Sequence, residues 1–307
     1  MARYIARRLL LAIPVLIGAS FLIFTMVFAL PGDPIRALGG DRPISAAVQA
    51  QLRDEYNLDD PLLVQYGKYV AGLAQGDLGT DFSGRPVSDI LSETVPVTVT
   101  LAFVALTFEA VFGLVAGVLA GIRQKSFFDS LVLVSTTLIV SIPVFVLGFV
   151  AQYVLGLKLG IFPIAGVASG FQGYLLPGFV LAALSLAYIA RLTRTSLVEN
   201  LRNDYVRTAK AKGLSPASVV GKHTLRNSLI PVVTYLGADL GLLLSGAIVT
   251  EGIFNIPGLG RAVFQAIQSQ EGNVVVGVVT LFVFVYIVFN LLVDVLYAAL
   301  DPRIRYE

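Results

Sequence analysis

The 307-residue sequence predicts an all-α, polytopic membrane protein with six transmembrane helices and both termini in the cytoplasm (N-in/C-in). Charged residues make up 14% of the chain and hydrophobic residues 56%, whereas about 25% of an ordinary soluble chain is charged. A soluble fold of this size could not bury so much apolar surface. Six separate stretches are instead apolar over the roughly 20 residues that a spanning helix needs, and Lys and Arg gather on one side of them.

The six predicted spans follow one another with few charges inside them. They are residues 9–30, 94–122, 130–157, 173–190, 227–250 and 273–300. The first is longer than the roughly 7–15 apolar residues of a secretory signal peptide, and no small-residue cleavage site follows it. We therefore expect residues 1–30 to form a cytoplasmic N-terminus and a retained first helix. The other five spans form a core over residues 97–300.

The distribution of Lys and Arg sets the predicted orientation. Fifteen of them lie in segments that are cytoplasmic in the N-in arrangement, and 7 lie in the opposite segments. Cytoplasmic loops of membrane proteins carry the excess of Lys and Arg. The sequence therefore predicts that both termini, including the tail at residues 301–307, lie inside the cell.

Residues 31–96 form a long extracytoplasmic loop in this topology. The loop is acidic, with ten Asp or Glu against five Lys or Arg. Ser45 is suited to cap a helix that runs toward Tyr56, and Asp60-Pro61 is typical of an N-cap followed by proline at the first helical position. Apolar residues then recur at helical spacing. These signals predict a small helical lid on the outer face.

Residues 191–228 form a second long loop, on the cytoplasmic side, with eight Lys or Arg against two acids. Apolar residues four apart predict one stripe on a basic helix; they are Leu197, Leu201, Tyr205 and Ala209. Gly213 should end that helix, and Ser215-Pro216 should start another. We expect two short helices that dock on a partner protein. Binding of anionic lipid headgroups would explain the charge but not the stripe.

Small and acidic residues in the predicted spans can each be interpreted in two ways. Gly113, Gly117 and Gly121 repeat every four residues, a pattern that lets helices approach closely in lipid, and we interpret them as packing residues rather than ligand contacts. Acids at membrane depth are costly and often functional; those present are Glu109, Asp239 and Asp294. They serve either a proton or substrate relay or structural hydrogen bonds, and we interpret them first as structural.

Several classes of site are excluded by the residues present. The chain has no cysteine and one histidine, His223, which excludes thiolate and multi-histidine metal sites. The Gly221-Lys222 pair lacks the first glycine and the final Ser/Thr of a phosphate-binding loop. An intramembrane protease would need a Ser–His pair or two aspartates at the same membrane depth. Here His223 lies in the predicted cytoplasmic loop, and Asp239 and Asp294 have no recognisable motif partner. We therefore predict no catalytic residues, no metal or cofactor bound by this chain, and no nucleic-acid partner.

The 191–228 loop resembles the signature of permease subunits of ATP-binding-cassette importers, which reads Glu-Ala-Ala, three residues, Gly, nine residues, Ile-x-Leu-Pro. With Gly213 as anchor, Ala209 and Leu225 match it, whereas Arg207 replaces the acidic residue. The stretch from Asp204 to Leu214, Asp-Tyr-Val-Arg-Thr-Ala-Lys-Ala-Lys-Gly-Leu, is more similar to the dipeptide/oligopeptide/nickel branch. Segments 4–9, 30–34, 254–261 and 300–305 resemble the same branch. A first span followed by a sizeable outer loop resembles its B-type permease.

The resemblance implies a type I importer permease in the bacterial plasma (inner) membrane. Its partners would be a second homologous permease, two cytoplasmic ATPase subunits that bind ATP and Mg, and an extracytoplasmic substrate-binding protein. The substrate would be a di- or oligopeptide. The residues that couple ATPase motion to the spans would be Asp204, Tyr205, Val206, Arg207, Ala209, Lys210, Gly213, Leu214, Ser215 and Pro216.

Two alternatives to a peptide importer stay open. The first is an importer of the same kind for nickel or another small solute. The second is a proton-coupled secondary transporter that uses Glu109 or Asp239. Inverted internal repeats would support a secondary transporter, and none is visible in the sequence.

Overall fold

The computed structural model describes residues 2–29, 35 and 45–300, and most of these residues are helical. Four stretches are long and apolar enough to cross a membrane: Arg7–Phe28, Val87–Ile122, Gln172–Asn200 and Gly272–Leu292. Two further pairs of helices pass the same test together, but each pair is bent, so the number of spans is between four and six. The all-α membrane class is confirmed for the described residues. Residues 30–34 and 301–307, which carry part of the family resemblance, lie outside them.

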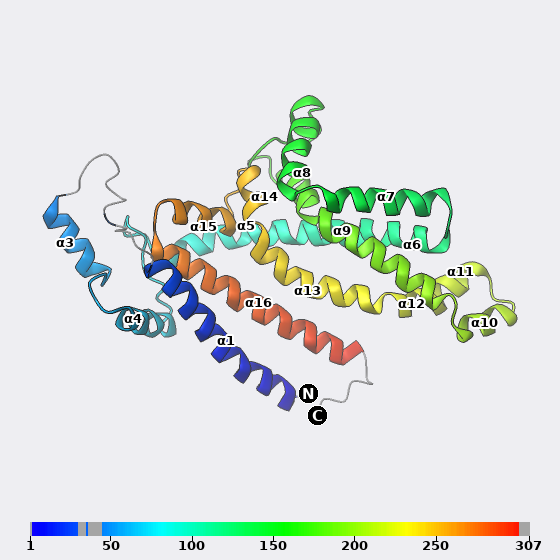
Figure 1. Cartoon of the computed structure of the whole chain (residues 1–307), viewed down its shortest axis with the longest axis horizontal. Helices are drawn as coiled ribbons and strands as arrows, with labels where there is room; N and C mark the ends of the chain where they lie inside the picture. The colour runs from blue at the N-terminus through cyan, green and yellow to red at the C-terminus, as the bar shows by residue number, and fades with distance from the viewer. Residues whose placement is uncertain (1, 30–34, 36–44, 301–307) are drawn as a thin grey trace.

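The long helices lie side by side in an elongated bundle (Figure 1). Helix α5 (Val87–Phe108), the π-helix η1 (Glu109–Gly113) and α6 (Leu114–Ile122) form one continuous stretch that packs along α9 (Gln172–Asn200). Helix α13 (Ile230–Gly246) packs on α5, on α9 and on α16 (Gly272–Leu300). Helix α1 (Ala2–Phe28) packs on α16 at the edge of the bundle. Helix α9 is therefore the centre of the core.

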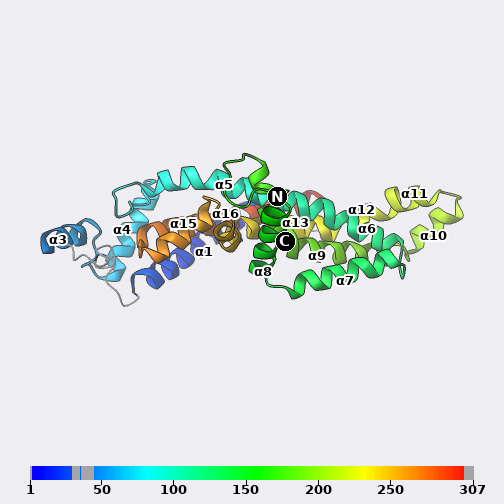
Figure 2. The same ribbon diagram turned by 90° about the horizontal axis from the view of Figure 1, so that it is seen from above.

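The predicted third span is sharply bent rather than straight. Helix α7 (Phe127–Ser141) meets the stretch made of α8 (Val144–Ala151) and η2 (Gln152–Lys158) at 103°, and α8 stands across the bundle in both views (Figures 1 and 2). Pro143 is the N-cap residue of α8. Because proline disfavours helical geometry at the preceding residue, Ile142 is extended, with φ −103° and ψ 126°. Residues 130–157 therefore consist of two helices, and Pro143 precedes the second one.

The two ends of the bundle carry different small helices. One end carries α3 (Ala46–Glu55) and α4 (Leu62–Ala74), and the opposite end carries α10 (Asp204–Ala211), α11 (Pro216–Ser218) and η3 (Val219–Thr224) (Figure 2). A four-residue helix, α12 (Leu225–Ser228), joins η3 to α13. The described parts of the two long loops of the sequence therefore lie at opposite ends of the molecule.

Helix α4 docks on the bundle through aromatic residues. Tyr66 and Tyr69 of α4 lie with their ring centroids 5.5 and 5.7 Å from that of Phe24 in α1. The Tyr69 hydroxyl donates to Thr280 Oγ1 in α16 at 3.1 Å, and burial raises the pKa of this tyrosine. The helical lid predicted from residues 31–96 is thus a packed part of the fold over its described residues.

The predicted caps of these helices are partly right. Ser45 caps α3, and its side chain accepts from Val48 N at 3.4 Å. Helix α4 begins one position later than expected, because Pro61 rather than Asp60 is its N-cap residue. Asp60 Oδ2 instead accepts from Lys68 Nζ at 2.6 Å.

The segment between α13 and α16 is a folded turn that the sequence analysis did not assign. Helix α14 (Ile248–Ile253) leads through a turn into α15 (Leu259–Gln268), an amphipathic helix at the end that carries α3 and α4. Leu259, Val263 and Ala266 of α15 are buried against residues of α5 and α16.

Candidate functional site

Residues 204–224, here named the basic hairpin, form a small helical hairpin with its own core. Val206 and Ala209 of α10 are buried against Val219 of η3. Gly213 makes the turn with φ +76°, a conformation that glycine adopts without the cost other residues meet. Ser215 caps α11, accepting from Ser218 N at 3.4 Å. Gly213 and Ser215-Pro216 thus end one helix and start the next, as their sequence pattern indicates.

The apolar stripe expected on one continuous helix is not present. Helix α9 ends at Asn200 and α10 begins at Asp204, so Leu197 and Ala209 belong to different helices. Leu197 is fully buried in the bundle, and Ala209 is buried inside the basic hairpin. The prediction was wrong because Asn200–Asn203 turn the chain; Asn203 takes the extended backbone of an N-cap, with ψ 152°.

The exposed surface of the basic hairpin is polar and basic, with two larger apolar side chains. Tyr205 and Leu214 are each 38% exposed, and the Tyr205 hydroxyl donates to Asn200 Oδ1 at 2.9 Å. Arg207 and Asp204 form an ion pair on this surface, with Nη1 and Oδ1 3.4 Å apart. Exposed ion pairs of this kind contribute little to stability. Tyr205 and Leu214 are therefore the hairpin residues best suited to contact another protein.

Buried hydroxyls connect the basic hairpin to the bundle. Thr224 Oγ1 donates to Val219 O at 3.0 Å. Ser228 Oγ in α12 contacts Thr224 O at 2.9 Å and Ser196 O of α9 at 3.4 Å. A displacement of the hairpin would therefore act on α9 and on the start of α13.

Three glycines bring α6 and η1 against α9. A Cβ at Gly113 would lie 2.8 Å from Ile189 Cγ2, and one at Gly121 would lie 2.9 Å from Leu197 Cδ2. At Gly117 it would lie 2.5 Å from the carbonyl oxygen of Ala190. The two helices therefore approach more closely than side chains at these positions would allow.

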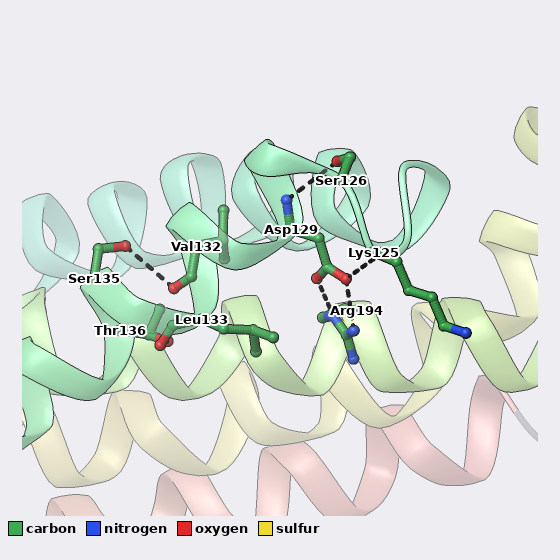
Figure 3. A network of polar contacts seen from close by, with 8 residues as sticks. All are labelled: Lys125, Ser126, Asp129, Val132, Leu133, Ser135, Thr136 and Arg194. Atoms are coloured by element: carbon green, nitrogen blue, oxygen red, sulfur yellow. Dashed lines mark hydrogen bonds and ion pairs between the residues drawn. The ribbon is translucent and has the colours of Figure 1, made fainter.

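An ion pair that the sequence analysis missed joins α7 to α9 (Figure 3). Arg194 Nε and Nη2 donate to Asp129 Oδ1 and Oδ2 at 2.5 and 2.8 Å, and Lys125 N donates to Oδ2 at 2.8 Å. Asp129 is almost fully buried. The signal in the sequence is Ser126-x-x-Asp129, which resembles a capping box; Ser126 Oγ accepts from Asp129 N at 3.4 Å.

Glu109 and Asp239, named separately from the sequence, lie together in the bundle. Both side chains are buried, and Asp239, Ser185 and Tyr235 are the polar neighbours of Glu109. Within the described residues, neither carboxyl oxygen of Glu109 has a hydrogen-bond partner. Glu109 also starts the π-helix η1, a feature often found at functional sites. The Asp294 side chain lies outside the described residues.

A second buried carboxylate, Glu251, was not singled out from the sequence. Its Oε1 accepts from Thr98 Oγ1 at 2.6 Å and its Oε2 accepts from Arg261 N at 3.0 Å. Thr98 Oγ1 in turn accepts from Leu259 N at 2.8 Å. A Cβ at Gly258 would overlap this carboxylate. Glu251 thus holds the first turn of α15 against α5, where the helix dipole favours a negative charge.

No metal site is apparent in the described part of the chain, where no three His, Asp or Glu residues gather in a way that could hold an ion.

Two family descriptions match nearly the whole chain. Residues 113–306 match the family described as binding-protein-dependent transport system inner membrane component, and residues 1–102 match its N-terminal region. The glutathione transport system permease protein GsiC of Escherichia coli K12 is 40% identical over 308 residues, covering 100% of both chains. GsiC proteins of Salmonella paratyphi A and Shigella flexneri are similar to the same extent.

A solved structure shows the same fold. The MetNI methionine ABC transporter in an inward-facing conformation aligns with a TM-score of 0.57 at 21% identity, over 69% of this chain and 96% of that chain. The helical membrane architecture and the basic hairpin fit the family that these matches indicate. The chain therefore belongs to the inner membrane components of binding-protein-dependent transport systems, the permease subunits of bacterial ATP-binding-cassette importers, and it is a multi-pass protein of the inner membrane.

Proposed function

We propose that this chain forms half of the translocation pathway of an ATP-driven importer for short peptides, with glutathione as the first candidate. The cargo is inferred from relatives named as glutathione permeases at 40% identity over the full length. In this proposal both termini lie in the cytoplasm, and each bent helix pair counts as one span, which gives six spans. Nickel or another small solute is the alternative cargo.

The observation that carries the proposal is the basic hairpin at the end of the bundle opposite α3 and α4. A permease without its own nucleotide site must receive work through a contact with an ATPase subunit. The hairpin offers Tyr205 and Leu214 for that contact and is tied to α9 through Ser228. The proposed partners are two ATPase subunits that carry the ATP and Mg, a second homologous permease, and a substrate-binding protein that docks on the α3–α4 end.

The proposed movement follows from these connections. Closure of the ATPase pair would displace the hairpin, and the hairpin would move α9 and α13 together because α12 contacts both of them. Helix α9 would then carry α6 and α7, through the glycine contacts and through the Asp129–Arg194 ion pair. The pathway would open to the opposite side of the membrane.

The test is to reconstitute the complex and to measure subunit co-purification, ATPase activity and peptide uptake with Tyr205→Ala. An exposed anchor of this kind contributes about 2 kcal/mol, so retention of the ATPase subunits should fall by roughly tenfold or more. Tyr153→Ala is the matched control, because Tyr153 is exposed on η2 outside the hairpin. Full assembly and full uptake with Tyr205→Ala combined with Leu214→Ala would contradict the coupling role.

A secondary transporter would behave differently in the same preparation. Glu109→Gln with Asp239→Asn should leave ATP-driven uptake intact, since the amides keep the volume and polarity of the buried acids. Uptake that proceeds without ATP, is stopped by a protonophore and is lost in this double variant would replace the proposal with proton coupling.

A further inference from the structure

The turn between α6 and α7, residues 123–128, exposes aromatic and basic side chains next to one another. Phe127 is 75% exposed and Phe128 is 46% exposed. The Arg123 guanidinium lies over the Phe128 ring, 5.1 Å from its centroid. The turn is at the end of the bundle that carries the basic hairpin (Figures 1 and 2). Phe and Leu on one face with Lys and Arg beside them are typical of helices at a membrane–water interface.

Helix α7 continues this surface as one exposed apolar face. Four residues that lie four, three and four positions apart are each 50–75% exposed: Phe127, Leu131, Val134 and Leu138. Residues at this spacing share one side of a helix, and Asp129 is buried on another side, against α9. At 1.5 Å per residue the face is about 16 Å long. The hydrocarbon of one leaflet is about 15 Å deep, so the face fits the acyl chains of a single leaflet.

Two cations at the start of this face have no counter-ion. Arg123 and Lys125 are exposed, and in the described part of the chain no carboxylate forms an ion pair with either side chain. The acid nearest in sequence, Asp129, is bound by Arg194. The backbone N of Lys125 also donates to Asp129, but the Lys125 side chain points away from it (Figure 3). Both cations are therefore available to an anion outside the chain.

The backbone of Lys125 is in the left-handed region, with φ +58°. Glycine adopts this region at no steric cost, and asparagine adopts it more readily than most residues. A residue held in such a conformation motivates a hypothesis of function at that position. At Lys125 the side chain gives the turn its second cation.

We propose that the 123–128 turn and the exposed face of α7 bind an anionic phospholipid, with its phosphate between Arg123 and Lys125 and its acyl chains along Phe127, Leu131 and Val134. The inference goes beyond the proposed import function. Only the identity of the leaflet, the cytoplasmic one, rests on the proposed orientation.

A phospholipid accounts for both parts of this surface. A helix of a second permease on α7 would cover the apolar face but would leave the two cations unexplained. An ATPase subunit at the turn would explain the cations but not an apolar face that runs about 16 Å along the helix. Anionic headgroups attract Lys and Arg near the membrane surface, by about fivefold in affinity for each residue.

The test uses tryptophan fluorescence of the purified full-length chain in lipid vesicles, since the chain has no tryptophan of its own. Leu131→Trp reports on the proposed site. Phe103→Trp is the matched control, because position 103 is exposed on α5 and no Lys or Arg lies between Arg85 and Arg123. The vesicles contain equal amounts of phosphatidylglycerol and phosphatidylcholine, and the acyl chains of one of the two are brominated to quench nearby tryptophan.

We expect phosphatidylglycerol to be preferred at least fivefold at position 131 and not at position 103. Arg123→Gln with Lys125→Asn should reduce the preference below twofold, and asparagine keeps the left-handed turn accessible. Lys212→Gln with Lys222→Gln removes two exposed cations of the basic hairpin instead and should leave the preference unchanged. High salt screens exposed charges, so it should lower the preference in the unmodified turn, which makes the result independent of how the turn variant folds.

Three results would overturn the site. Equal quenching by the two lipids at position 131 would show that the turn does not select an anionic headgroup. A preference that survives the turn variant and high salt, or that is lost equally in the hairpin variant, would assign it to general surface charge. Quenching by neither lipid would show that protein covers the α7 face, and a second copy of the chain would then be its occupant.

Discussion

Buried carboxylates in this chain have very different surroundings. Glu251 accepts hydrogen bonds from Thr98 and from the backbone of Arg261, whereas within the described residues the oxygens of Glu109 have no such partner. A buried carboxyl group with donors stabilises the elements that supply them, and one without donors costs free energy. The hydrogen bonds of Glu251 therefore explain why a carboxylate is buried there. For Glu109, the two interpretations given from the sequence stay open: a relay, or a structural contact with its neighbours Asp239 and Ser185.

Removing the Glu251 carboxylate should destabilise the protein. Glu251→Ala leaves Thr98 Oγ1 and Arg261 N without their acceptor in a buried site, a change that costs about 3 kcal/mol. Thermal unfolding in detergent should show the loss, and proteolysis should cut first near residues 254–258. Glu199→Ala, at an exposed acid on α9, serves as control. An unchanged melting temperature for Glu251→Ala would show that α15 is held by its apolar face alone.

Pairs of helices in the bundle are joined in two ways, by close backbone approach and by charge. The α6–α9 contact depends on Gly113, Gly117 and Gly121, and the α7–α9 contact includes the bidentate Asp129–Arg194 pair. Close approach gives van der Waals contact, which drives helix association in lipid. The ion pair also fixes how α7 is oriented relative to α9, because a guanidinium and a carboxylate form two parallel hydrogen bonds in one geometry.

A methyl group at the α6–α9 contact should be enough to disturb it. Gly117→Ala places a Cβ 2.5 Å from Ala190 O, and overpacking of this kind costs about 1–3 kcal/mol. Gly18→Ala in α1 is the matched control, since nothing lies within 4 Å of its Cβ position. The control should be neutral or slightly stabilising, because alanine favours helix over glycine. Equal melting temperatures for the two variants would show that α6 can move away from α9 at no cost.

The Asp129–Arg194 pair can be measured by a double-mutant cycle. Asp129→Asn and Arg194→Gln should each lower stability, and their coupling energy should be about 1–3 kcal/mol. Arg194→Lys should recover little of it, because an ammonium cannot form both hydrogen bonds. Thermal unfolding of the two single variants and the double variant gives this energy. Strict additivity would mean that the pair does not contribute to the α7–α9 contact.

At the scale of the whole molecule, the described parts of the two long loops lie at opposite ends of the bundle. A chain that crosses a membrane along the bundle axis therefore has α3 and α4 on one side and its basic hairpin on the other. The distribution of Lys and Arg predicts which side is cytoplasmic.

Cysteine labelling tests this orientation directly, because the chain has no cysteine. Ser83→Cys and Ala217→Cys introduce thiols at exposed positions at the two ends. In intact cells, an impermeant thiol reagent should label position 83 and not position 217, and permeabilised cells should label both. Labelling of position 217 in intact cells would reverse the topology.

The sequence by itself determined the class of the protein and most of its helices. Apolar length identified the four helices that are long enough to cross a membrane and the two bent pairs, because a bilayer leaves the backbone few alternatives to a helix. Ser45, Gly213 and Ser215-Pro216 marked helix ends correctly because capping is local chemistry. The resemblance at Asp204 to Leu214 indicated the family that the comparisons with known proteins show.

Tertiary structure decided everything that depends on which residues meet. Only the structure gives the angle of 103° between the two helices of residues 130–157, because periodicity records composition along a helix and not its direction. It placed Ala209 on a docking surface, whereas packing against Val219 buries it. The contacts of Asp129 with Arg194 and of Glu251 with Thr98 join residues 65 and 153 positions apart. Such partners are set by the packing of whole helices, which no local pattern encodes.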